Sequence, residues 1–190
     1  MDKTNISTKK PMVLVFAGPN GSGKTTIKDY FNIVGTYTNA DDLVKTTGMS
    51  NEEAAKYVDK LRYESIDAGK DITFETVLSS NYKMELLKYA KEKGYFIKCV
   101  FVLTVDASIN VARVQARVEQ GGHSVEPEKI KSRYSKALKN ISKLIEICDI
   151  MHVYDNSGDK VKRIIRKHKD DISIFPNEIW DEKKILDLID

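Results

Sequence analysis

The residues from Gly18 to Thr26, with the sequence GPNGSGKTT, have the types and spacing of a phosphate-binding loop. They fit the pattern G-x-x-x-x-G-K-[ST], in which glycines let several backbone N–H groups point at phosphate oxygens. Lys24 is expected to reach the β- and γ-phosphates of ATP, and the Thr25 hydroxyl to hold Mg²⁺. The residues expected to bind the nucleotide are Gly18, Pro19, Asn20, Gly21, Ser22, Gly23, Lys24, Thr25 and Thr26.

The neighbours of this loop support a site. An apolar run over residues 12–17 precedes it and reads as a buried strand, and residues 25–31 can begin a helix. The alternative is a glycine-rich turn that matches the pattern by chance. Strand, glycine loop and helix in this order favour the functional interpretation.

Acidic residues follow the second and third predicted strands, at the edge where a parallel sheet binds its ligands. Asp41 is expected to accept the proton of an attacking hydroxyl, while Asp42 suits the start of a short helix. A helix cap or a turn is the alternative role for either aspartate. Glu75, followed by Thr76, could hold a substrate hydroxyl or a magnesium-bound water, with a solvated edge residue as the alternative.

Two further polar positions follow the fourth and fifth predicted strands. Asp106 resembles a magnesium-binding aspartate, but it directly precedes a helical start and is expected to be a helix N-cap. The segment Asp155–Gly158 could contact a nucleotide base, and turn chemistry explains it equally well.

Basic residues gather around two adjacent glycines, Gly121 and Gly122. Arg113 and Arg117 are four residues apart on one predicted helix and share a face, and Arg133 lies on the next predicted helix. Arginines on a closing lid can neutralise the charge that develops during phosphoryl transfer. The alternative is a solvated basic face.

The glycine turn joins these two helices before the last strand, and we expect them to form a lid over about residues 108–135. His123, just after the glycines, could touch a phosphate or the substrate. A lone loop histidine is more often only exposed.

Strand-like and helix-like segments alternate, which predicts an α/β fold with three layers: a parallel sheet of about five strands flanked by helices. The strands are expected near residues 12–17, 34–38, 71–75, 96–105 and 150–154. The helices are expected near residues 24–32, 51–68, 82–93, 108–119, 127–147, 158–168 and 178–188.

Length and composition predict one globular domain over residues 11–190, after a flexible tail at residues 1–10. The net charge of +3 is too small to indicate a nucleic-acid partner. Cys99 and Cys148 lack metal-ligand spacing, so a reduced, cytoplasmic protein is expected. No apolar stretch is long enough for a membrane span, and no apolar signal core is present at the N-terminus.

The C-terminal segment is expected to form an amphipathic helix near residues 178–188 that docks on the domain. Trp180 could instead meet a partner protein or a second subunit.

Four segments occur in an order that resembles the zeta toxin-like kinases of bacteria: GPNGSGKTT, NADD, FETVLSS and VARVQARVEQGGHSVEPEKIKSRY. The resemblance covers roughly residues 11–157. The string R-V-x-x-R-V-x-x-G-G-H-x-V, with Arg133 downstream, is its most specific part and is similar to the lid of the compact branch of that family. The chain is shorter than the long toxins, and their acceptor-binding segments are not evident in it.

The resemblance implies a kinase-type P-loop sheet that uses ATP and Mg²⁺. The better-studied members phosphorylate the 3′-hydroxyl of UDP-N-acetylglucosamine, and an antitoxin is an implied partner. Carried over to this sequence, Asp41 would be the base, Glu75 and Thr76 would bind the acceptor, and Arg113 and Arg117 would be lid arginines.

The leading functional hypothesis is therefore an ATP-dependent phosphotransferase that acts on a hydroxyl of a small metabolite. A nucleotide-hydrolysing switch is a second hypothesis, although no guanine-reading N-K-x-D pattern is present. A non-catalytic nucleotide-binding module of a toxin–antitoxin pair is a third. The sequence does not choose the acceptor.

Overall fold

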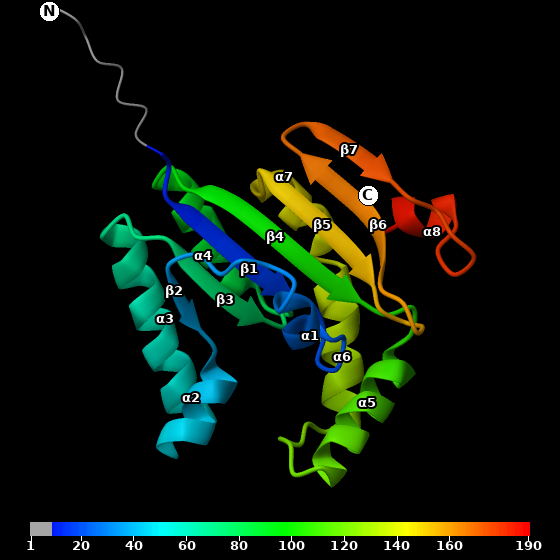
Figure 1. Ribbon diagram of the computed structural model, residues 1–190, viewed down its shortest axis with the longest axis horizontal. Helices are drawn as coiled ribbons and strands as arrows, with labels where there is room; N and C mark the ends of the chain where they lie inside the picture. The colour runs from blue at the N-terminus through cyan, green and yellow to red at the C-terminus, as the bar shows by residue number, and fades with distance from the viewer. Residues whose placement is uncertain (1–8) are drawn as a thin grey trace, which may run out of the picture.

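A computed structural model describes residues 9–190, so most of the predicted tail lies outside the described part of the chain. Its centre is a seven-stranded sheet with the order β2-β3-β1-β4-β5-β6-β7 (Figure 1). The strands are β1 (Met12–Ala17), β2 (Thr36–Thr38), β3 (Ile72–Thr76), β4 (Phe96–Leu103), β5 (Ile150–Asp155), β6 (Lys162–His168) and β7 (Asp171–Ile174). Strands β1 to β5 are parallel, and β6 and β7 are antiparallel to their neighbours.

Strand β1 lies between β3 and β4, and its sequence MVLVFA is apolar at every position because both faces of a central parallel strand are covered. Val13, Val15 and Ala17 face one side of the sheet, and Leu14 and Phe16 face the other. The parallel strands all end at one edge, and that edge carries the phosphate loop.

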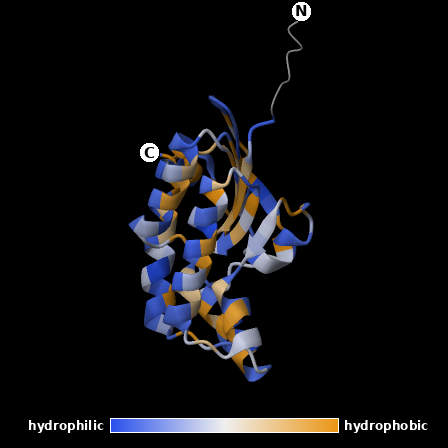
Figure 2. Ribbon diagram, turned by 90° about the vertical axis from the view of Figure 1, so that its left-hand side faces the viewer, coloured by the Kyte–Doolittle hydropathy of each residue, from blue (hydrophilic) through white to orange (hydrophobic). Residues whose placement is uncertain are grey.

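The helices are α1 (Lys24–Lys28), α2 (Ala40–Thr47), α3 (Asn51–Asp67), α4 (Asn81–Glu92), α5 (Ala107–Glu119), α6 (Pro127–Leu138), α7 (Ile141–Ile147) and α8 (Glu182–Leu186). Side chains of α3, α4, α6, α7 and α8 pack on one face of the sheet. The other face is covered by α1 and the chain that follows it. Figure 2 shows this unequal layering, with most helices on one side of the strands.

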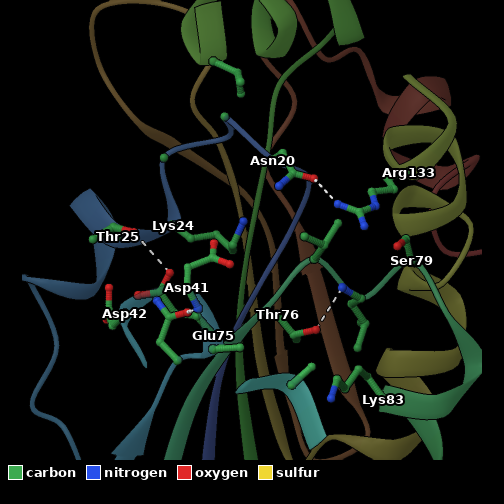
Figure 3. Close-up of a pocket in the computed structure, with 18 of the residues that line it drawn as sticks. Asn20, Lys24, Thr25, Asp41, Asp42, Glu75, Thr76, Ser79, Lys83 and Arg133 are labelled. Carbon is green, nitrogen blue, oxygen red and sulfur yellow. Dashed lines mark hydrogen bonds between the residues drawn. The ribbon is translucent and has the colours of Figure 1, made fainter. Parts of the chain in front are cut away.

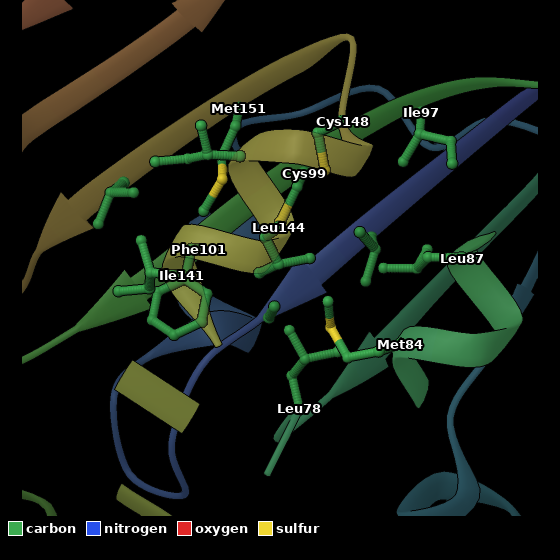
Figure 4. Packing of buried hydrophobic residues seen from close by; sticks show 14 of the residues in the cluster. Leu78, Met84, Leu87, Ile97, Cys99, Phe101, Ile141, Leu144, Cys148 and Met151 are labelled. Atoms are coloured by element: carbon green, nitrogen blue, oxygen red, sulfur yellow. The ribbon is translucent and has the colours of Figure 1, made fainter. Parts of the chain in front are cut away.

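The larger core lies under α4 and α7, and Figure 4 shows part of it. Leu87 of α4, Leu144 of α7 and Phe101 of β4 all belong to this core, and none of the three is accessible to solvent. Cys99 and Cys148 are neighbours in this core, both are buried free thiols, and burial raises the pKa of Cys99. No disulfide joins them.

Most of the predicted elements are present. The five predicted strands correspond to β1 to β5, and a capping box formed by Ser50 and Glu53 begins α3. Helix α1 is shorter than expected. Among residues 9–190, no helix is long and apolar enough to cross a membrane.

The predicted helix over residues 158–168 is wrong, and the sheet has seven strands instead of about five. Val161, Ile164 and Ile165 have helical spacing, but this segment pairs with β5 as strand β6. An irregularity opposite Val153 and Tyr154 lets both Ile164 and Ile165 reach the core. A two-residue turn then leads into β7, with Lys169 at φ 54°.

The predicted helix over residues 127–147 is divided into α6 and α7. Asn140 lies at the junction, and its side-chain amide donates a 2.8 Å hydrogen bond to the carbonyl of Leu78 in the loop after β3. Leu78 is a non-glycine residue with φ 55°, so Asn140 holds a loop in a conformation that few residues adopt. The break in the helix thus places Asn140 where it can hold Leu78, which lines the candidate site.

The C-terminal helix is shorter than the predicted 178–188 and runs from Glu182 to Leu186. The side chain of Asn177 accepts hydrogen bonds from the N–H groups of Ile179 and Trp180, which holds these residues in a turn. Asp181 then caps the helix. Trp180 is 5% exposed within the larger core, so it docks on the same chain.

Candidate active site

The phosphate loop joins β1 to α1 in a conformation that only glycine fits at two positions. Gly21 has φ 75°, and a Cβ atom there would lie 2.6 Å from the carbonyl oxygen of Asn110. Gly23 has φ 96° and immediately precedes α1, and a Cβ atom there would collide with the Asn156 side chain. The loop is therefore wedged between α5 and the turn after β5.

Two asparagines from distant parts of the chain hold the loop. The Asn110 amide on α5 donates a 2.6 Å hydrogen bond to the carbonyl of Asn20, and the Asn156 amide donates a 2.8 Å hydrogen bond to the carbonyl of Ser22. Asn110 is fully buried, and its own carbonyl oxygen accepts a hydrogen bond from Thr104. These contacts pre-form the loop without using its N–H groups.

Lys24 folds back over the loop. Its Nζ donates to the carbonyls of Gly18 at 2.8 Å and Pro19 at 2.9 Å. Burial lowers the pKa of Lys24 to about 8, although the nearby charges of Glu75 and Asp41 act to raise it. A triphosphate would meet this ammonium group at the mouth of the loop.

A cavity of about 660 Å³ opens next to the loop, and most of the predicted site residues lie on its wall (Figure 3). The predicted residues that line it are Asn20, Gly21, Gly23, Lys24, Thr25, Thr26, Asp41, Asp42, Glu75, Thr76, Arg113, Arg117 and Arg133. His123 is not among the residues that line this cavity. Its backbone carbonyl accepts a 3.1 Å hydrogen bond from Arg117.

Glu75 lies on the phosphate side of the cavity. Its carboxylate accepts hydrogen bonds from the Thr25 hydroxyl at 3.1 Å and the Tyr37 hydroxyl at 2.6 Å, and it forms a 3.4 Å ion pair with Lys28. Burial and the bond to Glu75 raise the pKa of Tyr37. Glu75 therefore lies beside Thr25, the residue predicted to hold Mg²⁺. Thr76 instead accepts a hydrogen bond from the N–H of Leu78.

Asp41 and Asp42 both lie in the first turn of α2. Asn39 is the cap of this helix, and its side chain accepts a 3.0 Å hydrogen bond from the N–H of Asp41. The capping function is thus supplied by Asn39, which leaves both carboxylates free to face the cavity. The charge of Asp41 acts on Lys24 across the cavity. Asp106 caps α5, as its sequence position predicted.

The three arginines approach the cavity from α5 and α6. Arg133 donates a 3.4 Å hydrogen bond to the Asn20 side chain, and Arg113 and Arg117 line the wall beside it. The root of α5 is fixed to the phosphate loop through Asn110, so any closing motion belongs to the far end of α5, near Arg117.

A buried charge cluster that the sequence analysis missed forms the opposite end of the cavity. Arg62 on α3 is 2% exposed, and its guanidinium bonds the Thr38 hydroxyl at 2.9 Å and the Asp59 carboxylate at 2.9 Å. Lys83 on α4 also bonds Asp59. The spacing of Asp59 and Arg62, three apart on a helix, is the only signal in the sequence, and many surface pairs share it.

The cluster ties α3 to the end of β2, directly before α2. It therefore helps to place Asp41, and it leaves one more positive than negative charge beside the cavity.

These residues fit ATP and magnesium. The loop offers free N–H groups and a lysine, which suit a triphosphate. Among residues 9–190 no group of three metal-ligating side chains occurs. Magnesium suits such a place, since it is commonly held by a hydroxyl or carboxylate together with phosphate oxygens and water.

The sheet order, the phosphate loop between β1 and α1 and the cavity at the carboxyl edge define a P-loop kinase-like fold. Residues 36–169 match the Zeta toxin family, and the chain belongs to that family. The match begins at Thr36 and does not include the phosphate loop. The loop is identified from its sequence and from its conformation in the structure. The family resemblance and the predicted fold class are thereby confirmed.

Solved structures show the same fold. AvrRxo1-ORF1:-ORF2 with ATP superposes with a TM-score of 0.66 at 15% identity, covering 88% of this chain and 61% of that chain. A structure from the PezAT chromosomal toxin–antitoxin system of Streptococcus pneumoniae superposes with a TM-score of 0.58 at 22% identity, covering 79% of this chain and 69% of that chain.

A sequence relative is closer in size. An uncharacterized protein of Haemophilus influenzae is 28% identical over 127 residues, which is 64% of this chain and 91% of that protein. By contrast, the chain spans only 61% of the length of the AvrRxo1 chain.

Proposed function

We propose that the protein is an ATP-dependent phosphotransferase that phosphorylates a hydroxyl of a small metabolite. The observation that carries the proposal is the cavity that has Lys24 and the phosphate loop on one wall and the carboxylate of Asp41 on another. Asp41 and Lys24 line the same cavity, so one bound substrate pair can contact both groups.

In this proposal the acceptor hydroxyl lies between Asp41 and the γ-phosphate. The hydroxyl oxygen forms a bond to the γ-phosphorus, the bond from phosphorus to the bridging oxygen breaks, and ADP leaves. The hydroxyl proton passes to the Asp41 carboxylate. Bound magnesium would neutralise charge on the phosphate oxygens, with the Thr25 hydroxyl as a ligand and Glu75 orienting a coordinated water.

Lys24 and the cavity arginines would stabilise the transferred group. Arg113 and Arg117 on α5 and Arg133 on α6 line the same cavity as the loop, so all three can approach the equatorial oxygens of the phosphoryl group. Closure of the far end of α5 would also exclude water, which limits wasteful hydrolysis of ATP.

The opposite end of the cavity suits an anionic acceptor such as a nucleotide sugar. Arg62 and Lys83 share the single carboxylate of Asp59, and Lys45 of α2 lies on the same wall. UDP-N-acetylglucosamine, the acceptor that the family resemblance implies, carries a diphosphate that would balance this charge. An antitoxin is the protein partner we propose, by analogy with the toxin–antitoxin relatives.

A substrate screen tests the proposal. The full chain is incubated with ATP, Mg²⁺ and a panel of nucleotide sugars and other hydroxyl compounds, and ADP release and product phosphate are measured. We expect acceptor-dependent ADP release that is abolished by Lys24→Ala.

Two outcomes would replace the proposal. Hydrolysis that no acceptor stimulates but a protein partner does would identify a nucleotide-hydrolysing switch. Tight ATP binding without any turnover would identify a non-catalytic module of a toxin–antitoxin pair.

A further inference from the structure

The face of the sheet that α1 covers is open over β5 and β6. Figure 1 is viewed from this side, and among the helices of residues 9–190 none crosses in front of these two strands. The register places His152 of β5 opposite Arg166 of β6, and Tyr154 opposite Arg163. Their neighbours Met151 and Val153 point the other way, into the larger core. Alternation along the strands therefore directs His152, Arg163 and Arg166 to the open face.

Lys98 of β4 also points to this side, since its neighbours Ile97 and Cys99 belong to the larger core. We call the surface formed by Lys98, His152, Arg163 and Arg166 the basic sheet face. Within residues 9–190, none of its lysine and arginine side chains forms an ion pair with a carboxylate.

The three cations of this face all act on His152. Burial, followed by the charges of Arg163, Lys98 and Arg166 in that order, lowers the pKa of His152 to about 4. The three positive charges thus converge on one point of the sheet. Asp171 of β7 is the one acidic residue that the register places on this side of β4 to β7, opposite His168.

Uncompensated cations at this density indicate an anionic partner, and the aromatic rings beside them indicate which kind. Lys98 lies 5.4 Å from the ring centre of Phe31, and Arg163 lies 5.0 Å from that of Phe175. Each ring already holds a cation over one face, so a nucleobase that stacked there would have to displace that cation. Phe175 is 38% exposed and leaves an apolar edge beside Arg163.

We propose that the basic sheet face docks an acidic segment of a protein partner, whose carboxylates pair with Lys98, Arg163 and Arg166 and whose apolar side chains contact Phe175. Charge complementarity selects the occupant, because three cations without carboxylate partners are satisfied by three acidic side chains in one short segment. The surface is built from β4 to β6 and does not include the cavity residues, so docking is compatible with an open active site.

A defined probe tests this proposal. A fluorescein-labelled peptide that alternates glutamate with leucine is titrated with the full chain, and fluorescence anisotropy is recorded at low salt. We expect saturable binding that weakens by about tenfold or more in the Arg163→Glu/Arg166→Glu variant. The matched control is Lys136→Glu/Lys143→Glu, which makes the same charge change on α6 and α7 behind the sheet and is expected to bind as the wild type does.

A milder variant, Arg163→Gln/Arg166→Gln, separates loss of docking from misfolding, and ATP affinity is measured in every variant. Unchanged ATP affinity with lost peptide binding supports the proposal. Three results overturn it: equal binding in all variants, tighter binding of an oligothymidylate of matched length that the same substitutions abolish, or a dimer in sedimentation that the Arg163 and Arg166 changes dissociate. The test does not measure kinase activity, so its failure would leave the proposed function unaffected.

Discussion

The side-chain amide of Asn156 donates a 2.8 Å hydrogen bond to the carbonyl of Ser22, although 134 positions separate the two residues. Asn156 follows β5, whereas Ser22 lies in the loop after β1. The bond holds the loop through a carbonyl and does not use its N–H groups. The shape of the phosphate loop therefore depends on a turn near the end of the parallel sheet.

Asn156→Ala should weaken both the fold and nucleotide binding. Loss of the amide leaves the Ser22 carbonyl without its protein partner, which is expected to lower the free energy of unfolding by about 1–3 kcal/mol. Urea unfolding and ATP titration measure the two effects. Asn156→Asp keeps the shape of the side chain but cannot donate the hydrogen bond, so it should lower stability and ATP affinity at least as much. The control is Asn51→Ala at an exposed position, which should change neither quantity. Wild-type ATP affinity in both Asn156 variants would show that the loop does not need this bond.

Nucleotide binding should take up a proton near pH 8. In the free protein burial lowers the pKa of Lys24 to about 8, so part of the population is neutral at that pH. A triphosphate favours the charged ammonium group and raises this pKa, so affinity should fall as the pH rises through 8. Calorimetry in buffers of different ionisation enthalpy measures the uptake. Lys24→Arg, which stays charged, should abolish it; an equal uptake in that variant would assign the proton to another group.

Asp41→Asn and Asp42→Asn form a matched pair on adjacent positions of α2. If Asp41 is the base, its replacement should lower kcat by about 100- to 10,000-fold with ATP affinity retained. The Asp42 variant should keep kcat within a few-fold of the wild type. Steady-state ADP release with the acceptor found in the screen measures both. The reverse order of effects would move the base to Asp42.

Arg62→Met should destabilise the protein by about 3–5 kcal/mol, because it leaves the Thr38 oxygens and the Asp59 carboxylate incompletely paired in a buried place. Lys60→Met on the same helix is the control. Lys60 forms only an exposed 3.7 Å ion pair with Glu64, so its loss should cost less than about 1 kcal/mol. Equal unfolding midpoints in urea for the two variants would refute a structural role for Arg62.

The phosphate-binding part of the site could be predicted from the sequence because its residues are consecutive in the chain. Nine consecutive residues, Gly18–Thr26, determine the loop, and the strand before it is apolar throughout. The acids followed from a general rule, that ligands bind at the carboxyl ends of parallel strands. Asp41 and Glu75 could be placed in this way without any knowledge of contacts.

The remaining features depend on contacts between distant segments. Arg62, Asn110 and Asn156 are ordinary polar residues in the sequence, and only the packing of α3, α5 and β5 shows what each one bonds. The hairpin of β6 and β7 was missed for a similar reason. Its turn uses Lys169 at a positive φ, where glycine or asparagine would have given a signal, and its apolar residues reach the core through an irregular strand.

Cys99 and Cys148 are the two cysteines in the chain, and neither is accessible beyond 1% of its surface. They lie beneath α7, on strand β4 and at the end of that helix. Alkylating reagents can modify them only when this part of the interior opens. The rate of thiol labelling therefore measures how often the domain opens locally. A nucleotide, acceptor or partner that slows thiol labelling stabilises the molecule against this opening. The measurement uses the native cysteines and needs no engineered label.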